Sequence, residues 1–295
     1  MNKKTRNIIL ANLGLILATL IWGFAFVVVK NSLDLIPPIY LTALRFSVAA
    51  IVCFAAFFKR IDFKDTKMLL EGAFLGALLF LGYSFQTVGC NYTTASKNAF
   101  LTSFYVLIVP LFSWFLTKSR PDIFCIVTAV FGIIGVGFIC LDNEGEINIG
   151  DILTLACAVF YAIHMVFLEK YNKHRDPAAM TTLQMTSVAI LAWIAAPIYD
   201  GALPIGVFTN PSAIVSILYL GLLSTMLAYL LQNASQKVLS ASNASLVMSL
   251  ESLFGAVFST IFLPDEHFTL KMIIGAVLLM GAIILSQIKP KIGVK

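Results

Sequence analysis

Charged side chains are scarce in this 295-residue chain: only 12% of the residues are Asp, Glu, Lys or Arg, whereas 59% are apolar or aromatic. Soluble domains carry about 25% charged residues, so this composition excludes a soluble globular protein. A mean hydropathy of +0.92 over the whole length also excludes a soluble enzyme with one membrane anchor, because the two parts would average to a much lower value. Most of the chain must therefore lie in a membrane.

The sequence also lacks the motifs that carry cofactor chemistry. It has no Walker-A, HExxH, GxSxG or DxDxDG pattern, and therefore no residues for ATP-driven transport, intramembrane metalloproteolysis or lipase chemistry. The five cysteines are scattered without CxxC spacing and predict small buried thiols: Cys53, Cys90, Cys125, Cys140 and Cys157. The net charge of +5 is spread over short loops rather than gathered on one face. We expect no cofactor, no metal and no nucleic-acid partner.

Ten apolar runs are long enough to cross a bilayer, which needs about 20 residues per helix. They cover residues 8–29, 38–58, 68–89, 99–116, 123–141, 149–168, 178–198, 213–234, 244–263 and 270–288. Short connectors with Pro and charged residues separate the runs and leave no room for a soluble domain. The predicted fold class is an all-α integral membrane protein with ten transmembrane helices.

The basic residues predict the orientation of these helices. If the N-terminus is cytoplasmic, sixteen Lys and Arg residues fall inside, Lys30, Lys97 and Lys271 fall outside, and Arg45 lies within a span. Cytoplasmic loops of membrane proteins are enriched in Lys and Arg. We therefore expect a multi-pass protein of the plasma membrane with both termini in the cytoplasm.

The chain contains an internal repeat. An offset of 146 residues lays Phe80–Ser113 over Met226–Ser259 without a gap, and nine of the 34 pairs are identical. Offsets of 138 and 139 relate earlier segments, and the second of these pairs Pro38 with Pro177. The sequence thus predicts two five-helix repeats, residues 1–146 and 147–295, and because five is odd, the two repeats must be inverted in the membrane. Inverted repeats provide a physical route to alternating access.

Four segments resemble the recurrent segments of EamA-type carriers in the drug/metabolite transporter (DMT) superfamily. They are LATLIWGFAFVVVK (17–30), TTASKNAFLTSFYVLIVPLFS (93–113), GDILTLACAVFYAIHMVFLEK (150–170) and LSASNASLVMSLESLFGAVFS (239–259). The resemblance implies a ten-helix inverted-repeat carrier with a central cavity, typically one that exports amino acids or other small metabolites. The family often has Glu-Pro where this chain has Glu251-Ser252, so the expected proline kink has no proline here.

Ionisable residues deep in a span are costly and are therefore functional candidates. Arg45 lies in the second span, and its equivalent in the other repeat is the neutral Gln184. Glu251 is the one acidic residue well inside a span, and its equivalent in the other repeat is Tyr105. His164 lies in the sixth span. Glu251 and then His164 are the proton-coupling candidates. The structural alternatives are a pinned Arg45, a permanently protonated Glu251 and a hydrogen-bonded His164.

Polar and aromatic side chains recur at matching positions of the two halves. Tyr83 and Gln86 share one helical face, as do Tyr229 and Gln232, which predicts that both pairs line a substrate cavity. The residues Arg45, Tyr105 and Gln184 complete the predicted binding set.

Two further aromatics and three helix starts join the candidate site. The resemblance implies cavity positions for Trp22 and Tyr161, although either could be core. Lys97 and Asn98 begin the fourth span and Asn243 begins the ninth, so they are candidates for a gate. Ordinary capping, or a lysine that reaches to water, would also explain these three residues.

The favoured function is a secondary active transporter, not an enzyme, that moves a small polar metabolite outward by alternating access. One positive and one negative intramembrane group suit a zwitterion such as an amino acid. The expected partners are this small molecule, the lipid bilayer and protons. The alternative is a membrane-embedded enzyme or lipid-handling protein that uses Arg45, His164 and Glu251 on a lipid head group.

Overall fold

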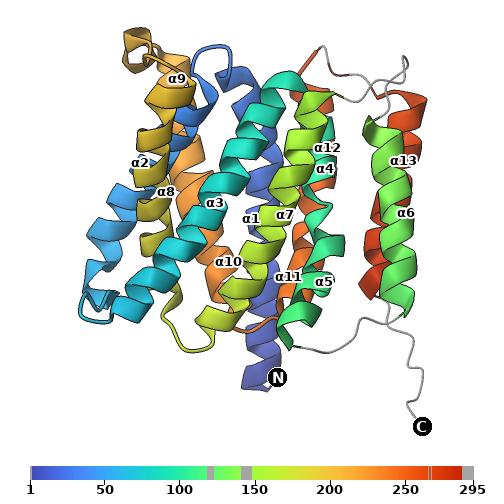
Figure 1. Ribbon diagram of the computed structural model, residues 1–295, viewed down its shortest axis with the longest axis horizontal. Coiled ribbons are helices and arrows are strands. Elements are labelled where there is room, and N and C mark those ends of the chain that lie inside the picture. Colours follow the sequence, from blue (N-terminus) through green and yellow to red (C-terminus); the bar gives the residue numbers. More distant parts are fainter. Residues whose placement is uncertain (1, 118–122, 141–147, 265, 267, 288–295) are drawn as a thin grey trace.

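The computed structural model describes residues 2–117, 123–140, 148–264, 266 and 268–287, and the regular structure in these ranges is helical (Figure 1). The first half contains α1 (Lys3–Ser32), α2 (Pro38–Phe57), η1 (Phe58–Arg60), α3 (Thr66–Tyr92), α4 (Ala95–Thr102), α5 (Tyr105–Thr117) and α6 (Ile123–Cys140). The second half contains α7 (Ile149–Asn172), α8 (Pro177–Tyr199), η2 (Ile205–Phe208), α9 (Pro211–Leu218), η3 (Tyr219–Leu227), α10 (Ala228–Gln236), α11 (Ala241–Met248), α12 (Leu250–Phe262) and α13 (Leu270–Gln287).

Each predicted span corresponds to one helix or to consecutive helices that continue one another. Within the described residues, eight of these segments are long and apolar enough to cross a membrane. The other two are α6 and α13, whose described apolar stretches are Val130–Ile139 and Leu270–Leu285. Large apolar side chains such as Ile51, Phe115 and Val277 are exposed on the outer surface, where lipid would cover them. The all-helical membrane fold class is confirmed.

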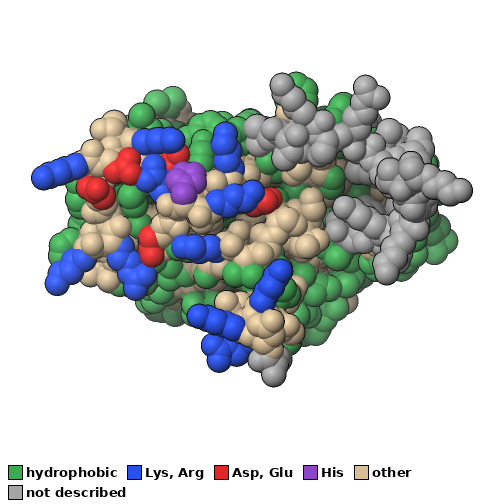
Figure 2. Space-filling view, turned by 90° about the horizontal axis from the view of Figure 1, so that it is seen from below, with side chains coloured by type: hydrophobic (Ala, Val, Ile, Leu, Met, Phe, Trp, Pro, Cys, Tyr) green, Lys and Arg blue, Asp and Glu red, His purple; other side chains and the backbone are tan. Residues whose placement is uncertain are grey.

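Basic residues gather at the end of the molecule where α1 begins, which we call the basic end. Figure 2 looks at this end and shows many Lys and Arg side chains and few acidic ones. Exposed examples are Arg6, Lys59, Lys64 and Lys170. At the opposite end, Lys30, Lys97 and Lys271 are each partly buried. The charge difference used to predict the orientation is therefore present in three dimensions.

The two halves pack into one another rather than side by side. The most extensive helix contacts are α3 with α7, α6 with α13, α2 with α8, and α1 with α12, and each of these pairs joins the two halves. The contacts also follow the repeat, because α3 with α7 and α3 with α8 have counterparts in α10 with α1 and η3 with α2. The interior between the halves is thus built from equivalent helices of both repeats, as expected for inverted repeats.

The starts of α4 and α11 show how closely the repeat is kept. Thr94 and Ser240, which are 146 residues apart, are the N-caps of these helices, and each accepts a hydrogen bond from the backbone three residues later. A carboxylate from elsewhere adds to each start: Glu266 accepts from the Ser96 N–H at 3.0 Å, and Glu169 accepts from the Ala241 N–H at 2.8 Å. Acidic groups stabilise helix N-termini because the first N–H groups are free.

Three interruptions were not predicted from the apolar runs. The fourth span is broken between α4 and α5 at Ser103–Phe104, and the ninth is broken at Ser249 although no proline follows Glu251. The eighth span contains η3, a nine-residue π-helix over Tyr219–Leu227. Such π segments are rare and are frequently found at functional sites. All three interruptions lie next to the interior described below.

Candidate functional site

A polar cavity lies between the two halves. Its walls come from α1, α2, α3, α4 and α5 of the first half, and from α7, η3, α10, α11 and α12 of the second. The centre of a water molecule can occupy about 50 Å³ of it, which is room for a few waters or the polar part of a small metabolite. The cavity therefore has the location of a substrate site in a carrier built from two repeats.

Eleven of the fourteen residues singled out from the sequence line this cavity. They are Trp22, Arg45, Tyr83, Gln86, Asn98, Tyr105, Tyr161, His164, Tyr229, Gln232 and Glu251. Gln184 lies directly behind the wall, where it contacts His164. Lys97 lies nearer the end opposite the basic end and pairs with an acid. Asn243 is exposed at the start of α11 and is not brought to the cavity.

Arg45 is held by the π-helix of the other half. Only 2% of Arg45 is exposed, and its Nε and Nη2 donate to the hydroxyls of Thr225 at 2.9 Å and Ser224 at 2.8 Å. The guanidinium carbon is 4.8 Å from the centre of the Tyr83 ring, within reach of a cation–π interaction. These contacts use two of the five N–H donors of the guanidinium. The charge is thus fixed in place while donors remain for an anion.

Glu251 places a carboxyl group in the same cavity. It is 6% exposed and lies beside the phenol of Tyr105, its repeat partner. No ion pair within 4.0 Å joins Arg45 and Glu251 in the described part of the chain. A guanidinium and a carboxyl group that share a cavity without pairing leave both available to a ligand.

Aromatic rings line the same cavity. Tyr83 packs against Tyr161 and Tyr229 with ring centres 5.6 and 6.2 Å apart, and Trp22 packs edge-on against Tyr229 at 5.4 Å. The Trp22 indole N–H donates to the backbone oxygen of Ser224 at 2.8 Å. A π-helix changes which carbonyls are bonded within the helix, so that a carbonyl can accept from a neighbouring side chain.

The first half contributes an amide network on one side of the cavity. Gln86 donates to Thr102 at 3.1 Å and accepts from the Tyr161 hydroxyl at 3.0 Å. Asn98 donates to Thr154 at 2.8 Å, and its Oδ1 is buried without a hydrogen-bond partner among the described residues. Buried polar atoms in proteins are almost always satisfied, so an open acceptor in the cavity wall is a natural contact for a ligand or water.

The second half contributes a network on the other side. His164 Nε2 is 2.8 Å from Gln184 Oε1, and the Gln184 amide donates to Asn233 at 3.3 Å. Gln232 donates to Gln236 at 3.0 Å, while its own Oε1 is buried and has no partner in the described ranges. Each half thus presents one unsatisfied amide oxygen at or beside the cavity.

Lys97 belongs to a closure between the halves at the end opposite the basic end. Its Nζ lies 3.7 Å from Asp151 Oδ2, and Thr93 donates to Asp151 Oδ1 at 2.6 Å. Asp151 lies in the first turn of α7 and is fully buried. The contact ties α4 of the first half to α7 of the second.

Arg175 makes the corresponding closure at the basic end. It donates to Glu71 at 2.6 Å and also pairs with Asp65. The pKa of Asp65 is lowered, first by the hydrogen bond from the Met68 backbone and then by Arg175. Burial works against the charge of Arg175, but its bonds to Glu71 and Asp65 outweigh burial and raise its pKa. Both closures are therefore ion pairs between the first half and the α7 region.

Three hydroxyl residues that bond the cavity side chains were not predicted from the sequence. Ser224, Thr225 and Thr102 are hydroxyl residues, and such side chains in membrane helices mostly bond their own backbone, so they carry little signal alone. The one available signal lies in the repeat: Gly76 and Tyr83 are seven residues apart, whereas Gly221 and Tyr229 are eight apart. The π-helix η3 takes up this extra residue.

Comparison with known proteins gives the family. The sequence model of the EamA-like transporter family matches residues 9–141 and 148–287. An uncharacterised transporter of Archaeoglobus fulgidus is 35% identical over 288 residues, which cover 95% of this chain and 86% of that protein. A probable amino-acid metabolite efflux pump of Escherichia coli is 26% identical over 275 residues and 90% of each chain. One crystal structure has a TM-score of 0.69 at 18% identity, covers 94% of this chain and 96% of its own, and supports the fold.

Proposed function

Because the chain belongs to the EamA-like transporter family of the DMT superfamily, we propose that it is a secondary active carrier that moves an amino acid or a related zwitterion outward. Membership of this family makes it a multi-pass membrane transporter of small molecules and not an enzyme. The alternative of an enzyme acting on a lipid head group is therefore set aside. The substrate, the direction and the coupling are the proposal.

One observation carries the substrate class: Arg45 and Glu251 line the same cavity without pairing with each other. Arg45 would bind the substrate carboxylate through its remaining N–H donors, since a guanidinium matches a carboxylate in shape and charge. Glu251 and the open oxygens of Asn98 and Gln232 would accept from the ammonium group. A dianion such as a phosphate ester would meet the carboxylate of Glu251 and is disfavoured.

The rings of the cavity would enclose the remainder of the substrate. A chain of ring contacts joins Trp22, Tyr229, Tyr83 and Tyr161, and these rings offer apolar faces with polar edges. The name of one relative agrees with this class, since the Escherichia coli protein is named a probable amino-acid metabolite efflux pump.

Glu251 is also the proposed coupling site. A carboxyl that faces a cavity open first to one side and then to the other can take up a proton in one compartment and release it in the other. Its charge then alters the affinity for the substrate ammonium. His164 lies in the same cavity and bonds Gln184, which makes it the second candidate. Exchange of conformation between the halves, residues 1–146 and 147–295, would supply alternating access.

The positive-inside rule gives the proposed orientation, with the basic end and both termini in the cytoplasm. Single-cysteine labelling in intact cells should modify a cysteine placed at Asp200 and spare one placed at Lys237. The opposite pattern would reverse the orientation and the direction of export.

Counterflow in liposomes tests the function itself. Purified protein is reconstituted into vesicles preloaded with one unlabelled metabolite from a panel of amino acids, amines and nucleosides, and the uptake of the labelled form is followed. The proposal predicts transient accumulation of at least one zwitterionic amino acid, with the compound recovered unchanged. Accumulation of amines or nucleosides only would contradict the substrate class.

A further inference from the structure

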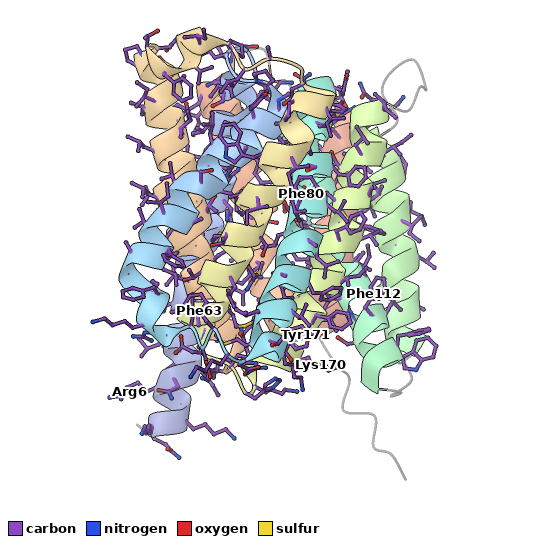
Figure 3. All side chains as sticks on the ribbon, turned by 60° about the vertical axis from the view of Figure 1, so that its left-hand side comes forward. Arg6, Phe63, Phe80, Phe112, Lys170 and Tyr171 are labelled. Carbon is purple, nitrogen blue, oxygen red and sulfur yellow. The ribbon has the colours of Figure 1, made fainter. Side chains whose placement is uncertain are left out.

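A second hollow lies at the basic end, on the outer surface and away from the central cavity. It is a groove between the start of α3 and the end of α7, in which the centre of a water molecule can occupy about 420 Å³. Its walls include Lys67, Leu70 and Phe74 from α3, Lys170 and Tyr171 from α7, and His174 from the following loop. Figure 3 shows Lys170 and Tyr171 toward the same end of the molecule as Arg6.

The side chains of the groove are ordered from polar to apolar along the membrane normal. On α3, Lys67 comes first, followed by Leu70 and Phe74, which are 65% and 40% exposed. On the antiparallel α7, the basic Lys170 lies nearer the end than Phe167, whose ring packs edge-on against Phe74 at 5.0 Å. Amphipathic side chains at membrane interfaces follow the same order as a phospholipid, with polar groups outside and apolar groups inside.

The positive charges of the groove are not used by the protein. Lys67 and Lys170 form no ion pair with any acidic group of the described residues. The ammonium of Lys170 lies 5.8 Å from the centre of the Phe167 ring, which directs it over the groove wall.

The acidic group of the groove is already bound by residues of the protein. Glu71 is 6% exposed and accepts from Arg175 Nε at 2.6 Å. Its other oxygen lies 3.6 Å from His174 Nε2, which holds the imidazole at the rim. The groove therefore offers two uncompensated lysines, a phenol and an imidazole to an anion.

From this arrangement we propose that the groove between α3 and α7 binds the head group of an anionic phospholipid from the leaflet at the basic end. Lys67 and Lys170 would flank the phosphate, Tyr171 and His174 would donate to head-group oxygens, and an acyl chain would lie over Leu70 and Phe74. Basic pockets between transmembrane helices bind lipid head groups in this manner. The exposed apolar residues below the lysines favour a lipid over free phosphate, and the uncompensated charge favours an anionic lipid over a zwitterionic one.

Native mass spectrometry of the purified full-length protein tests this site. The protein in neutral detergent is titrated with phosphatidylglycerol, with phosphatidylcholine of the same chain length, and with inorganic phosphate. The double variant Lys67→Gln/Lys170→Gln is compared with Lys59→Gln/Lys64→Gln, which removes two exposed lysines of the same end outside the groove. At about 1 kcal/mol for each lysine, phosphatidylglycerol should bind the groove variant roughly 30-fold more weakly, and the control variant should bind it like the parent.

Three results would overturn the proposal. If the parent binds phosphatidylcholine as tightly as phosphatidylglycerol, the groove does not recognise the charge of the head group. If it binds inorganic phosphate as tightly, the groove does not recognise a lipid. An equal loss in the two double variants would show only a general attraction to the basic end. Circular dichroism melting of both variants in the same detergent verifies that each is folded, and since all four lysines are exposed, folding should be retained.

Discussion

The third span of the first half and its counterpart in the second half differ by one residue, and this difference shapes the cavity. In the first half, α3 is an uninterrupted helix. Its counterpart runs through α9, η3 and α10, where the π-helix absorbs the additional residue between Gly221 and Tyr229. A Cβ at Gly221 would lie 2.7 Å from the Val48 Cβ, and one at Gly76 would likewise collide with Ser187, 139 residues after Val48. The close crossing at the glycine, of α3 with α8 and of η3 with α2, is thus the same in both halves. The two spans differ only in the segment that follows this glycine.

This segment of the second half contains the residues that bind Arg45. Ser224 and Thr225 of the π-helix bind the guanidinium, whereas the first half has Leu78 and Leu79 at this level, both buried. The position equivalent to Arg45 in the second half is the neutral Gln184, and the position equivalent to Glu251 in the first half is Tyr105. The comparison teaches that duplication supplied the shape and aromatic lining of the cavity, while departures from the duplication supplied its charges.

The largest effect is expected from Glu251→Gln, which makes this position uncharged as in the first half. The variant keeps the shape and hydrogen bonding of the side chain but cannot titrate, so it should abolish accumulation driven by an imposed pH difference. Exchange of substrate for substrate should continue, because no net proton movement is needed. The two modes are measured in the same proteoliposomes. Accumulation against a gradient by the Gln variant would transfer the coupling role to His164.

Arg45→Gln removes the other asymmetric charge and copies Gln184 into the first half. Hydrogen bonds between charged partners contribute about 1.5–3 kcal/mol, so substrate affinity should fall by roughly 10- to 150-fold. The matched control is Arg60→Gln, whose ion pair with Asp176 is largely exposed and should leave affinity unchanged. Isothermal titration with the substrate found by counterflow gives both numbers. If Arg45→Gln binds as tightly as the parent, Arg45 is a structural pin.

Much of the fold could be predicted because its cause is visible in one dimension. Apolar runs of bilayer length predicted ten helices, and nine identities at an offset of 146 residues predicted the repeat. The breaks at Ser103 and Ser249 and the π-helix were missed, because hydropathy is the same for a continuous and an interrupted apolar helix. The N-terminal helix begins at Lys3 rather than at residue 8, since a helix can continue past the apolar run into polar residues.

Part of the candidate site was predictable because placing an ionisable side chain in a membrane costs free energy. Arg45, His164 and Glu251 stood out for that reason, and all three line the cavity. Their roles remain predictions. Cys53, Cys90 and Cys157 are free and buried as expected, while the side chains of Cys125 and Cys140 lie outside the described set. Distances between residues of different helices cannot be read from a sequence, so Asp151 could not be recognised as the partner of Lys97.

Removing the hydroxyls of the π-helix should weaken binding less than removing Arg45. In Ser224→Ala/Thr225→Val the guanidinium keeps its charge but loses two hydrogen bonds of about 1 kcal/mol each, so affinity should fall by at most roughly 30-fold. The control is Thr181→Val, a buried threonine that bonds its own helix at the Pro177 oxygen. Titration of both variants with the same substrate provides the comparison. An unchanged affinity in the double variant would show that the altered register does not serve Arg45.

The smallest effect is expected from the paired amides Gln86 and Gln232, and the property that is lowered should differ between the halves. Gln86 bonds two neighbours, Thr102 and Tyr161, so Gln86→Leu should lower the melting temperature as well as transport. Gln232 keeps a free oxygen, so Gln232→Leu should lower substrate affinity by roughly threefold, corresponding to about 0.6 kcal/mol for one hydrogen bond in a membrane protein. Melting curves and transport rates are measured on both. Parental transport in both variants would make the Tyr and Gln identities a trace of the duplication only.

The most direct test of the account compares three ligands that share one carbon skeleton. Leucine carries both charges, leucinamide keeps the ammonium only, and 4-methylpentanoate keeps the carboxylate only. If Arg45 and Glu251 each bind one end of the substrate, leucine should raise the melting temperature of the parent protein and the single-charge analogues at the same concentration should not, because binding to the folded state shifts the midpoint by mass action. Equal stabilisation by leucinamide or by 4-methylpentanoate would contradict a site that requires both charges.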